Sequence, residues 1–452
     1  MSKLELVKST SGIRGVVGNG LDPVMITAYG AAFGTFLKRG PVVIGRDSRP
    51  SGEMVNRAVI AGLMSVGIDV IDIGIVPTPT VEIAVKKVKA SGGICVTASH
   101  NPSQWNALKF FNERGEFITP DQYKLLDAIF LSNSFAYVSY QKLGAVSQQT
   151  QWIDEHIRQT LRLKTINLKA IKSRRFKVVV DAINGAGSIA LPALLEKLGV
   201  KVVCINCKGD GDFVHKPEPI PAHLRQLAAA VRKHRADLGL ACDPDADRLV
   251  LVDEQGRAIN EELTLTVAVK QVLKREKGST VINLSTSSTT AAVAKGMGSQ
   301  VFYSKVGESN VVQMMREKQA VIGGEGNGGV IYPTFHAGRD ALVGTALVLS
   351  CLAEENRSLS ELVGTFPRYC IIKSKATLPE DFKQRLERFA GEAGKLLGKT
   401  KADNRDGMRF DFAEGWVQIR SSNTEPIYRL IVETTSRKLT ASLHDKIISF
   451  FA

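Results

Sequence analysis

The sequence predicts an α/β protein built from three related α/β domains with mixed sheets and a smaller α+β domain at the carboxyl end. Three stretches share one plan, in which a strand-like apolar run is followed by a polar loop, a helix and a second strand; they cover residues 41–74, 177–206 and 279–304. A strand–helix–strand crossover makes neighbouring strands parallel. After about Phe366 the pattern changes, because short alternating runs surround one helix predicted over 378–397.

Within each repeat the hydrophobic period changes from that of a strand to that of a helix and back. In the first repeat, Val55, Val59, Leu63 and Val66 share one helical face. Gly67, Gly199 and Gly298 mark the turn after the three helices. The chain of 452 residues suits three or four units. The positions of the repeats predict domains at 1–140, 141–253, 254–365 and 366–452.

Composition and charge restrict the class of protein. With 44% apolar and 23% charged residues, no apolar run of membrane-spanning length and no leader-like segment at 1–11, we expect a globular protein of the cytoplasm without a membrane partner. The six cysteines are expected to be reduced, buried thiols. A net charge of +14 favours acidic partners, either small phosphates or nucleic acid. The basic stretch 157–177 contains only one aromatic residue, so it does not predict a platform for stacking bases.

The segment 92–102, GGICVTASHNP, contains the first candidate for chemistry. A buried strand ends there in a polar loop, at the edge of the sheet where open α/β proteins bind their ligands. The Ser99 hydroxyl is a candidate carrier of a phosphoryl group, if nearby groups compensate the charge of a phosphoserine. The alternative is that SHNP forms an ordinary turn.

The segment 243–248, DPDADR, predicts a cation site. Asp243, Asp245 and Asp247 alternate with other residues in a loop between two apolar runs, and such carboxylates converge on a hard cation if the chain wraps around it. An EF-hand is excluded, because Arg248 replaces its turn glycine and strands replace its helices. Mg²⁺ is the better match, and an acidic surface turn is the alternative.

Two further polar segments favour a sugar phosphate as ligand. In 323–329, GGEGNGG, Glu325 can accept hydrogen bonds from two adjacent hydroxyls and Asn327 can both donate and accept. In 420–426, RSSNTEP, a planar guanidinium is followed by hydroxyls, an amide and successive backbone N–H groups, which together suit a phosphate; the residues are Arg420, Ser421, Ser422, Asn423 and Thr424. A glycine-rich turn and a Ser/Thr-rich turn are the respective alternatives.

Taken together, these four segments resemble the α-D-phosphohexomutases, which interconvert hexose 1-phosphates and hexose 6-phosphates. The resemblance covers essentially the whole chain in the family's order, and STSGIRG near the start, with Arg14, resembles the family's opening segment. It implies four domains around a central cleft and a small-molecule hexose phosphate as partner, with no nucleic acid. It also implies a hexose 1,6-bisphosphate as primer and intermediate. The chain is expected to be a monomer or a homodimer.

The resemblance also implies roles for individual residues. Ser99 would be the phosphoserine, and one of its oxygens would bind Mg²⁺ together with Asp243, Asp245 and Asp247. Arg14, His100, Lys109 and Arg248 would line the reaction centre. Lys109 would move the hydroxyl proton if neighbouring cations lower its pKa. His336, in FHAGRD, would approach the sugar.

The sequence departs from the commonest family pattern at two positions. Asn327 stands where serine is more common, and Asn423 stands where glycine is common. The GEGNGG loop resembles the branch that contains archaeal-type phosphoglucosamine mutases and phosphomannomutases, which favours glucosamine phosphate over mannose or glucose phosphate. A catalytically silent sugar-phosphate sensor is the remaining alternative, and an intact Ser99, aspartate set and Lys109 argue against it.

Overall fold

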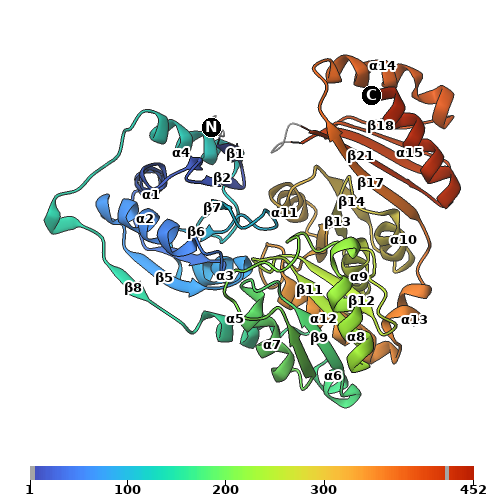
Figure 1. Ribbon diagram of the computed structural model, residues 1–452, viewed down its shortest axis with the longest axis horizontal. Coiled ribbons are helices and arrows are strands. Elements are labelled where there is room, and N and C mark those ends of the chain that lie inside the picture. The colour runs from blue at the N-terminus through green and yellow to red at the C-terminus, as the bar shows by residue number, and fades with distance from the viewer. Residues whose placement is uncertain (1–5, 423–426, 452) are drawn as a thin grey trace.

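The computed structural model describes residues 6–422 and 427–451. Four sheets follow one another along the chain (Figure 1). The first and fourth domains lie at the two ends of the molecule, and the second and third lie between them (Figure 1). Across the described ranges, no helix combines the length and apolar character needed to cross a membrane.

The first domain contains the largest sheet, with strand order β1-β2-β7-β6-β4-β5-β8 and β3 paired to β2. Strands β4, β5 and β6 are mutually parallel as predicted, and β7 runs antiparallel to β6. The sheet extends past residue 140, because β8 pairs with β5. The elements are β1 Val7–Ser9, β2 Gly12–Val17, β3 Gly20–Leu21, α1 Pro23–Leu37, β4 Val42–Arg46, α2 Gly52–Ser65, β5 Val70–Ile75, α3 Thr78–Val88, β6 Gly92–Val96, β7 Trp105–Phe111, α4 Pro120–Leu131 and β8 Val146–Gln148.

The second domain has the strand order β10-β9-β11-β12. Strands β10 and β11 are parallel to β9, and β12 returns antiparallel to β11. The predicted crossover is therefore confirmed, and the aspartate segment forms the loop between β11 and β12. The elements are α5 Trp152–Thr160, α6 Leu168–Arg174, β9 Lys177–Asp181, α7 Gly187–Lys197, β10 Lys201–Ile205, α8 Arg225–His234, β11 Leu238–Cys242 and β12 Leu249–Asp253.

The third domain repeats this plan in the order β14-β13-β15-β16. Strands β14 and β15 are parallel to β13, and β16 is antiparallel to β15. The GGEGNGG segment thus occupies the position that the aspartate loop has in the second domain. The elements are α9 Glu262–Arg275, β13 Thr280–Asn283, α10 Ser288–Gly296, β14 Val301–Ser304, α11 Glu308–Glu317, β15 Ile322–Glu325, β16 Gly329–Ile331, α12 Ala341–Glu355 and α13 Leu359–Gly364.

The fourth domain is the predicted α+β unit. Its antiparallel sheet has the order β17-β21-β20-β19-β18, and apolar side chains of α14 and α15, such as Phe389 and Ile447, pack in its core. The predicted helix over 378–397 begins later, at Phe382. Pro379 disfavours a helical conformation for Leu378, and a turn in which Phe382 N donates to Pro379 O at 3.1 Å precedes the helix. The elements are β17 Cys370–Thr377, α14 Phe382–Leu397, β18 Lys401–Asp403, β19 Met408–Phe412, β20 Gly415–Ser421, β21 Ile427–Thr434 and α15 Arg437–Phe451.

The apolar cores determine how the domains sit against one another. The second and third domains share one continuous core, in which Leu191, Leu240, Leu265 and Leu347 take part. A shared core of this kind fixes the two sheets relative to each other, so the loops at their edges have fixed relative positions. The first and fourth domains have cores of their own.

All six cysteines are free thiols, as expected, but they are not all buried. Cys204 is exposed and Cys207 and Cys370 are half-buried. The expectation of burial is wrong for Cys204, because β10 lies at the edge of the second sheet and pairs only with β9.

Candidate active site

Ser99 lies in the loop after β6, at the carboxyl end of that buried strand. The residue is 3% exposed and its φ of 49° is left-handed, a conformation that is uncommon for serine. Its Oγ donates a hydrogen bond to Asp243 Oδ2 at 2.9 Å and lies 3.3 Å from His100 Nδ1. The hydroxyl of the first domain therefore touches the aspartate loop of the second.

The three carboxylates of the aspartate loop converge. Asp243, Asp245 and Asp247 are buried, and one oxygen of each lies within 4.8 Å of the others. Burial and the neighbouring Asp247 and Asp245 raise the pKa of Asp243 well above its ordinary value. Within the described part of the chain, Asp245 Oδ1 and Asp247 Oδ1 have no hydrogen-bond partner, which is rare for buried charged atoms. Free, mutually repelling oxygens of this kind fit a hard divalent cation such as Mg²⁺.

Lys109 lies on β7 and reaches the same carboxylates. Its Nζ donates to Asp245 Oδ2 at 2.6 Å and lies 3.4 Å from Asp247 Oδ2. Burial alone would lower the pKa of this ammonium group, but Asp245 and Asp247 raise it above its usual value. The condition of a lowered pKa is therefore not met in this arrangement, because the nearest charges are carboxylates rather than cations.

Arginines from the first two domains surround the serine and the aspartates. Arg14, on β2, donates to Asn101 Oδ1 at 2.5 Å, and burial lowers its pKa to about 10 although Asp245 opposes the change. Arg248 follows the aspartate loop, and its Nε lies 3.8 Å from both Asp243 Oδ2 and Asp247 Oδ1. Burial, assisted by Arg248 and Arg14, lowers the pKa of His100 well below its ordinary value. The site is thus rich in fixed positive charge.

Arg339 was not predicted from the sequence, yet it joins two of the predicted loops. Its Nη2 donates to Asp247 Oδ2 at 2.6 Å and its Nη1 to Glu325 Oε2 at 3.0 Å. The third contact is from Nε to Glu308 Oε2 at 2.9 Å. The available signal was the charged pair Arg339–Asp340 directly before the apolar run of α12, and a sequence pattern does not say which loop such an arginine reaches.

Glu325 ends β15, and its carboxylate is held from several sides. Oε1 accepts from Asn283 Nδ2 at 2.8 Å and from Gly307 N at 2.9 Å, and Oε2 accepts from Arg339. Asn327 Nδ2 lies 3.4 Å from Oε2. Although burial opposes it, Arg339 and these hydrogen bonds lower the pKa of Glu325. The Glu325 carboxylate is therefore anionic and is chemically able to accept hydrogen bonds from hydroxyl groups.

His336 lies in a buried network rather than among the loops. Its Nδ1 is 3.1 Å from Glu82 Oε2 and its Nε2 is 2.9 Å from Asp340 Oδ2, so each ring nitrogen contacts a carboxylate. Asp340 Oδ2 also lies 2.8 Å from His156 Nε2. Burial alone would lower the pKa of His336, but Asp340 and Glu82 raise it to about 9. The imidazolium therefore links the first domain to the third.

The predicted phosphate loop of the fourth domain is only partly described. Arg420 is the residue before the last in β20 and lies directly opposite Arg429 on β21. Ser421 and Ser422 follow it, whereas Asn423 and Thr424 lie outside the described residues. Burial lowers the pKa of Arg420. Its buried Nε has no partner among the described residues, which suits an anionic ligand.

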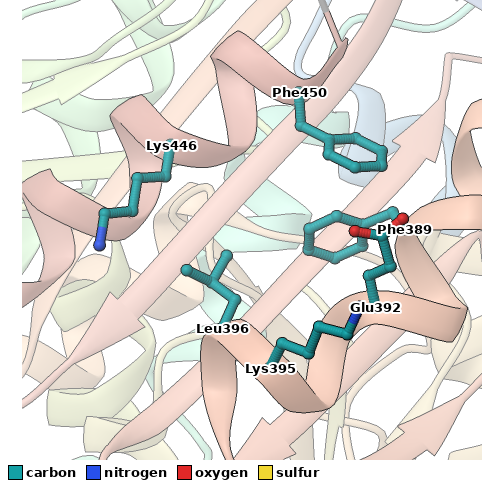
Figure 2. A pocket seen from close by; sticks show the side chains of 6 residues that line it. All are labelled: Phe389, Glu392, Lys395, Leu396, Lys446 and Phe450. Atoms are coloured by element: carbon teal, nitrogen blue, oxygen red, sulfur yellow. The ribbon is translucent and has the colours of Figure 1, made fainter.

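The fourth domain also contains a hollow of about 290 Å³ between α14 and α15 (Figure 2). Phe389, Leu396 and Phe450 form its apolar wall, while Glu392, Lys395 and Lys446 line the rest. None of the predicted site residues lines it.

A serine hydroxyl, three converging carboxylates and a ring of arginines form an arrangement that is chemically suited to moving a phosphoryl group. Comparisons with known proteins agree. The chain matches four family descriptions in order: phosphoglucomutase/phosphomannomutase alpha/beta/alpha domain I over 5–137, domain II over 154–256, domain III over 260–369, and the C-terminal domain over 373–449.

Curated relatives and solved structures are similar over nearly the whole chain. A phosphoglucomutase/phosphomannomutase of Thermococcus kodakarensis is 38% identical over 95% of this chain and 94% of its own. A probable phosphoglucosamine mutase of Methanopyrus kandleri is 34% identical over 97% and 96%. The crystal structure of a phosphoglucomutase/phosphomannomutase family protein from Burkholderia thailandensis superposes with a TM-score of 0.86 at 29% identity, covering 98% and 96%.

The chain belongs to the phosphoglucomutase/phosphomannomutase family, the α-D-phosphohexomutases. The predicted four-domain α/β fold is confirmed by the same matches.

Proposed function

We propose that the protein is a phosphohexomutase, an isomerase that interconverts hexose 6-phosphates and hexose 1-phosphates, with glucosamine phosphate as its preferred substrate. The contact between Ser99 Oγ and Asp243 is the observation that carries this proposal. It brings a hydroxyl that can hold a phosphoryl group to the only cluster of three candidate metal ligands found among the described residues. Full-length relatives named as mutases support the reaction class.

In the proposed reaction, phosphorylated Ser99 transfers its phosphoryl group to the free hydroxyl of a bound hexose monophosphate. The O–P bond at Ser99 breaks as the bond to the sugar oxygen forms, and a 1,6-bisphosphate results. The sugar then turns end for end and returns its other phosphoryl group to Ser99. In the first transfer one proton passes from the sugar hydroxyl to Ser99 Oγ, and in the second one proton passes from Ser99 Oγ to the sugar oxygen that loses its phosphoryl group. Lys109, whose ammonium group contacts Asp245 and Asp247, is the proposed relay.

Asp243, Asp245 and Asp247 would hold Mg²⁺ together with an oxygen of the phosphoserine. When bound, Mg²⁺ supplies positive charge to the transferring phosphoryl group. Arg14, His100 and Arg248 line the same space. Arg14 and Arg248 add fixed positive charge near the reacting oxygens, which is the main requirement of phosphoryl transfer.

The substrate must bind in two orientations, so its non-reacting phosphate needs a constant partner. Arg420 and the loop 421–424, with Ser421, Ser422, Asn423 and Thr424, are proposed for that role. The buried Arg420 Nε, which has no hydrogen-bond partner within 6–422 and 427–451, supports it. Glu325 and Asn327 would contact hydroxyls common to both orientations. His336 is assigned to the support of the site rather than to the sugar, because both of its ring nitrogens contact carboxylates.

The test compares Ser99→Ala with Ser103→Ala, a change at an exposed serine of the same loop. With Mg²⁺ and a hexose 1,6-bisphosphate present, Ser99→Ala should lose more than about 10³-fold in turnover, while Ser103→Ala keeps wild-type activity. Intact mass should show one added phosphate on the wild type and none on Ser99→Ala. Wild-type protein that takes up no phosphate and turns over no hexose phosphate would refute the mutase assignment.

Parallel turnover assays with glucosamine, mannose and glucose phosphates identify the preferred substrate. The GEGNGG loop and the Methanopyrus relative favour glucosamine phosphate. The Thermococcus relative at 38% identity favours phosphomannomutase or phosphoglucomutase activity as the second candidate.

We further propose the cytoplasm as the compartment, which the six free thiols support. We also propose a monomer or a homodimer, and sedimentation would distinguish the two. Domain boundaries at 253 and 365 remain part of the proposal, whereas we place the boundary predicted at 140 after β8, because β8 belongs to the first sheet.

A further inference from the structure

The segment after β4 lies beside the Ser99 loop, because β4 and β6 are adjacent parallel strands whose carboxyl ends share one edge. Arg49, in this segment, is completely buried. Its guanidinium donates to the backbone carbonyls of both ends of the Ser99 loop. Nη2 bonds to Ser99 O and to Asn101 O at 2.7 Å, and Nη1 bonds to Pro102 O at 2.6 Å and Trp105 O at 3.0 Å.

Asp47 completes this arrangement from the amide side of Ser99. Its Oδ2 accepts from Arg49 Nε at 2.9 Å and from Thr97 Oγ1 at 2.6 Å. The same Thr97 Oγ1 accepts from Ser99 N at 2.9 Å. Both peptide groups that flank the Ser99 side chain are therefore tied to one buried ion pair, Asp47–Arg49.

These contacts act on a residue that is not in a relaxed conformation. Ser99 has a φ of 49°, which costs free energy for any residue with a Cβ and persists only where the surroundings enforce it. With this backbone, Ser99 Oγ faces Asp243 Oδ2 at 2.9 Å. A loop that relaxed to a negative φ would turn the hydroxyl away from the aspartates.

Arg49 itself does not face the substrate. Its side chain has no exposed surface, and the ring of Phe213, from the second domain, lies 5.0 Å from the guanidinium carbon. Every hydrogen bond described for its guanidinium goes to the Asp47 carboxylate or to a backbone carbonyl. Its influence on chemistry must therefore pass through the shape of the loop.

We infer that Arg49, with Asp47 and Thr97, is a positioning residue that holds the Ser99 hydroxyl in its phosphoryl-accepting orientation. This role rests on the proposed function, in which Ser99 carries the phosphoryl group. It requires the planar fork of an arginine, because a lysine ammonium has three donors and cannot reach the same set of carbonyls in one plane.

Two matched pairs of variants test the inference. Thr97→Val removes the hydroxyl with little change of volume, and Thr97→Ser retains it. Arg49→Lys retains the charge without the fork, and Arg57→Lys makes the same change at an arginine whose side chain is 78% exposed. The first readout is the single-turnover rate at which Ser99 takes phosphate from a hexose 1,6-bisphosphate, followed by intact mass. KM for the hexose phosphate and the thermal midpoint are measured alongside.

A small displacement of a reacting atom can cost about 10²-fold in rate. We expect Arg49→Lys to slow Ser99 phosphorylation by about that factor, and Thr97→Val by about 10-fold, with KM within about threefold of wild type. Thr97→Ser should restore the rate and Arg57→Lys should not change it. Rescue by Thr97→Ser at an unchanged thermal midpoint is a result that a purely structural role would not produce.

Three outcomes overturn the inference. The first is a wild-type phosphorylation rate in both Arg49→Lys and Thr97→Val, with the mutase activity intact. The second is a raised KM with an unchanged single-turnover rate, which would place Arg49 in substrate binding. The third applies if Arg49→Lys fails to fold: equal rates in Thr97→Val and Thr97→Ser then decide against the inference. Wild-type protein that never phosphorylates Ser99 is a separate result, which contradicts the proposed function itself.

Discussion

The buried His336 network predicts a pH dependence of stability that can be worked out from the structure. His336 contacts Glu82 from the first domain and Asp340 from the third, and Asp340 also contacts His156. Replacement by glutamine in His336→Gln keeps a polar side chain of similar reach but removes the titrating group. Because Asp340 and Glu82 outweigh burial, the pKa of His336 in the folded protein is raised from 6.5 to about 9.

The sign and the size of the pH effect on stability follow from the raised pKa of His336. A folded state that binds the proton more tightly gains stability below pH 6.5 and loses it as the pH rises towards 9. At about 1.4 kcal/mol for each tenfold change in proton affinity, the contribution is about 3 kcal/mol. A loss of that size lowers the thermal midpoint by roughly 5–10 °C in a chain of large domains.

The assay is thermal unfolding between pH 6 and 9.5, followed by circular dichroism, for the wild type, His336→Gln and the half-exposed control His234→Gln. Wild type and His234→Gln should lose stability across this range, whereas His336→Gln should start from a lower midpoint and change much less. A His336→Gln curve parallel to that of the wild type would refute the reasoning, since the pH dependence would then arise elsewhere.

Three further predictions concern the site. Gly329→Ala places a Cβ 2.3 Å from Arg339 Cδ and should lower kcat/KM by about 10–10²-fold. The control is Gly296→Ala, where the added Cβ has no atom within 4 Å. Equal steady-state kinetics for the two variants would contradict the prediction. Arg339→Met removes a cation shared by three buried carboxylates, of which Asp247 keeps only Lys109 at 3.4 Å and Arg248 at 3.8 Å, and should cost about 3–5 kcal/mol in urea unfolding. Arg316→Met, at a pair whose arginine is half-exposed, should cost less than about 1 kcal/mol; similar losses would contradict the prediction. Chelation should abolish turnover, and Mg²⁺ at about 100-fold its Kd should stabilise the wild type by about 2.7 kcal/mol in thermal scans but not Asp245→Asn; equal stabilisation of both would exclude the aspartate site.

Much of the site could be predicted because its residues occur as short polar segments that interrupt apolar runs. Ser99 and the three aspartates follow strands, and Glu325 and Arg420 lie among the last two residues of theirs. Arg49 gives the same kind of signal, in GRDSR at the end of β4. Nothing local distinguishes an arginine that binds substrate from one that binds the carbonyls of a loop 50 residues away.

The electrostatics could not be predicted from local sequence. Lys109 lies among apolar residues of β7, and only the folded chain shows that Asp245 and Asp247 surround its ammonium group. His336 looked available to a ligand from its position in FHAGRD, and its two carboxylate partners come from Glu82 and Asp340. In both cases the deciding partners include residues more than 100 positions away.

By itself, the sequence determined which segments become strands and helices, that three units share a crossover plan, and which polar residues end the strands. These properties depend on neighbours within a few positions, through hydrophobic period and turn chemistry. The tertiary structure alone decided which loops touch, which charges lie within a few ångströms of Lys109, and how Arg49 and Arg339 connect loops from different parts of the chain. Those outcomes depend on packed cores that bring distant segments together, and local sequence does not encode that geometry.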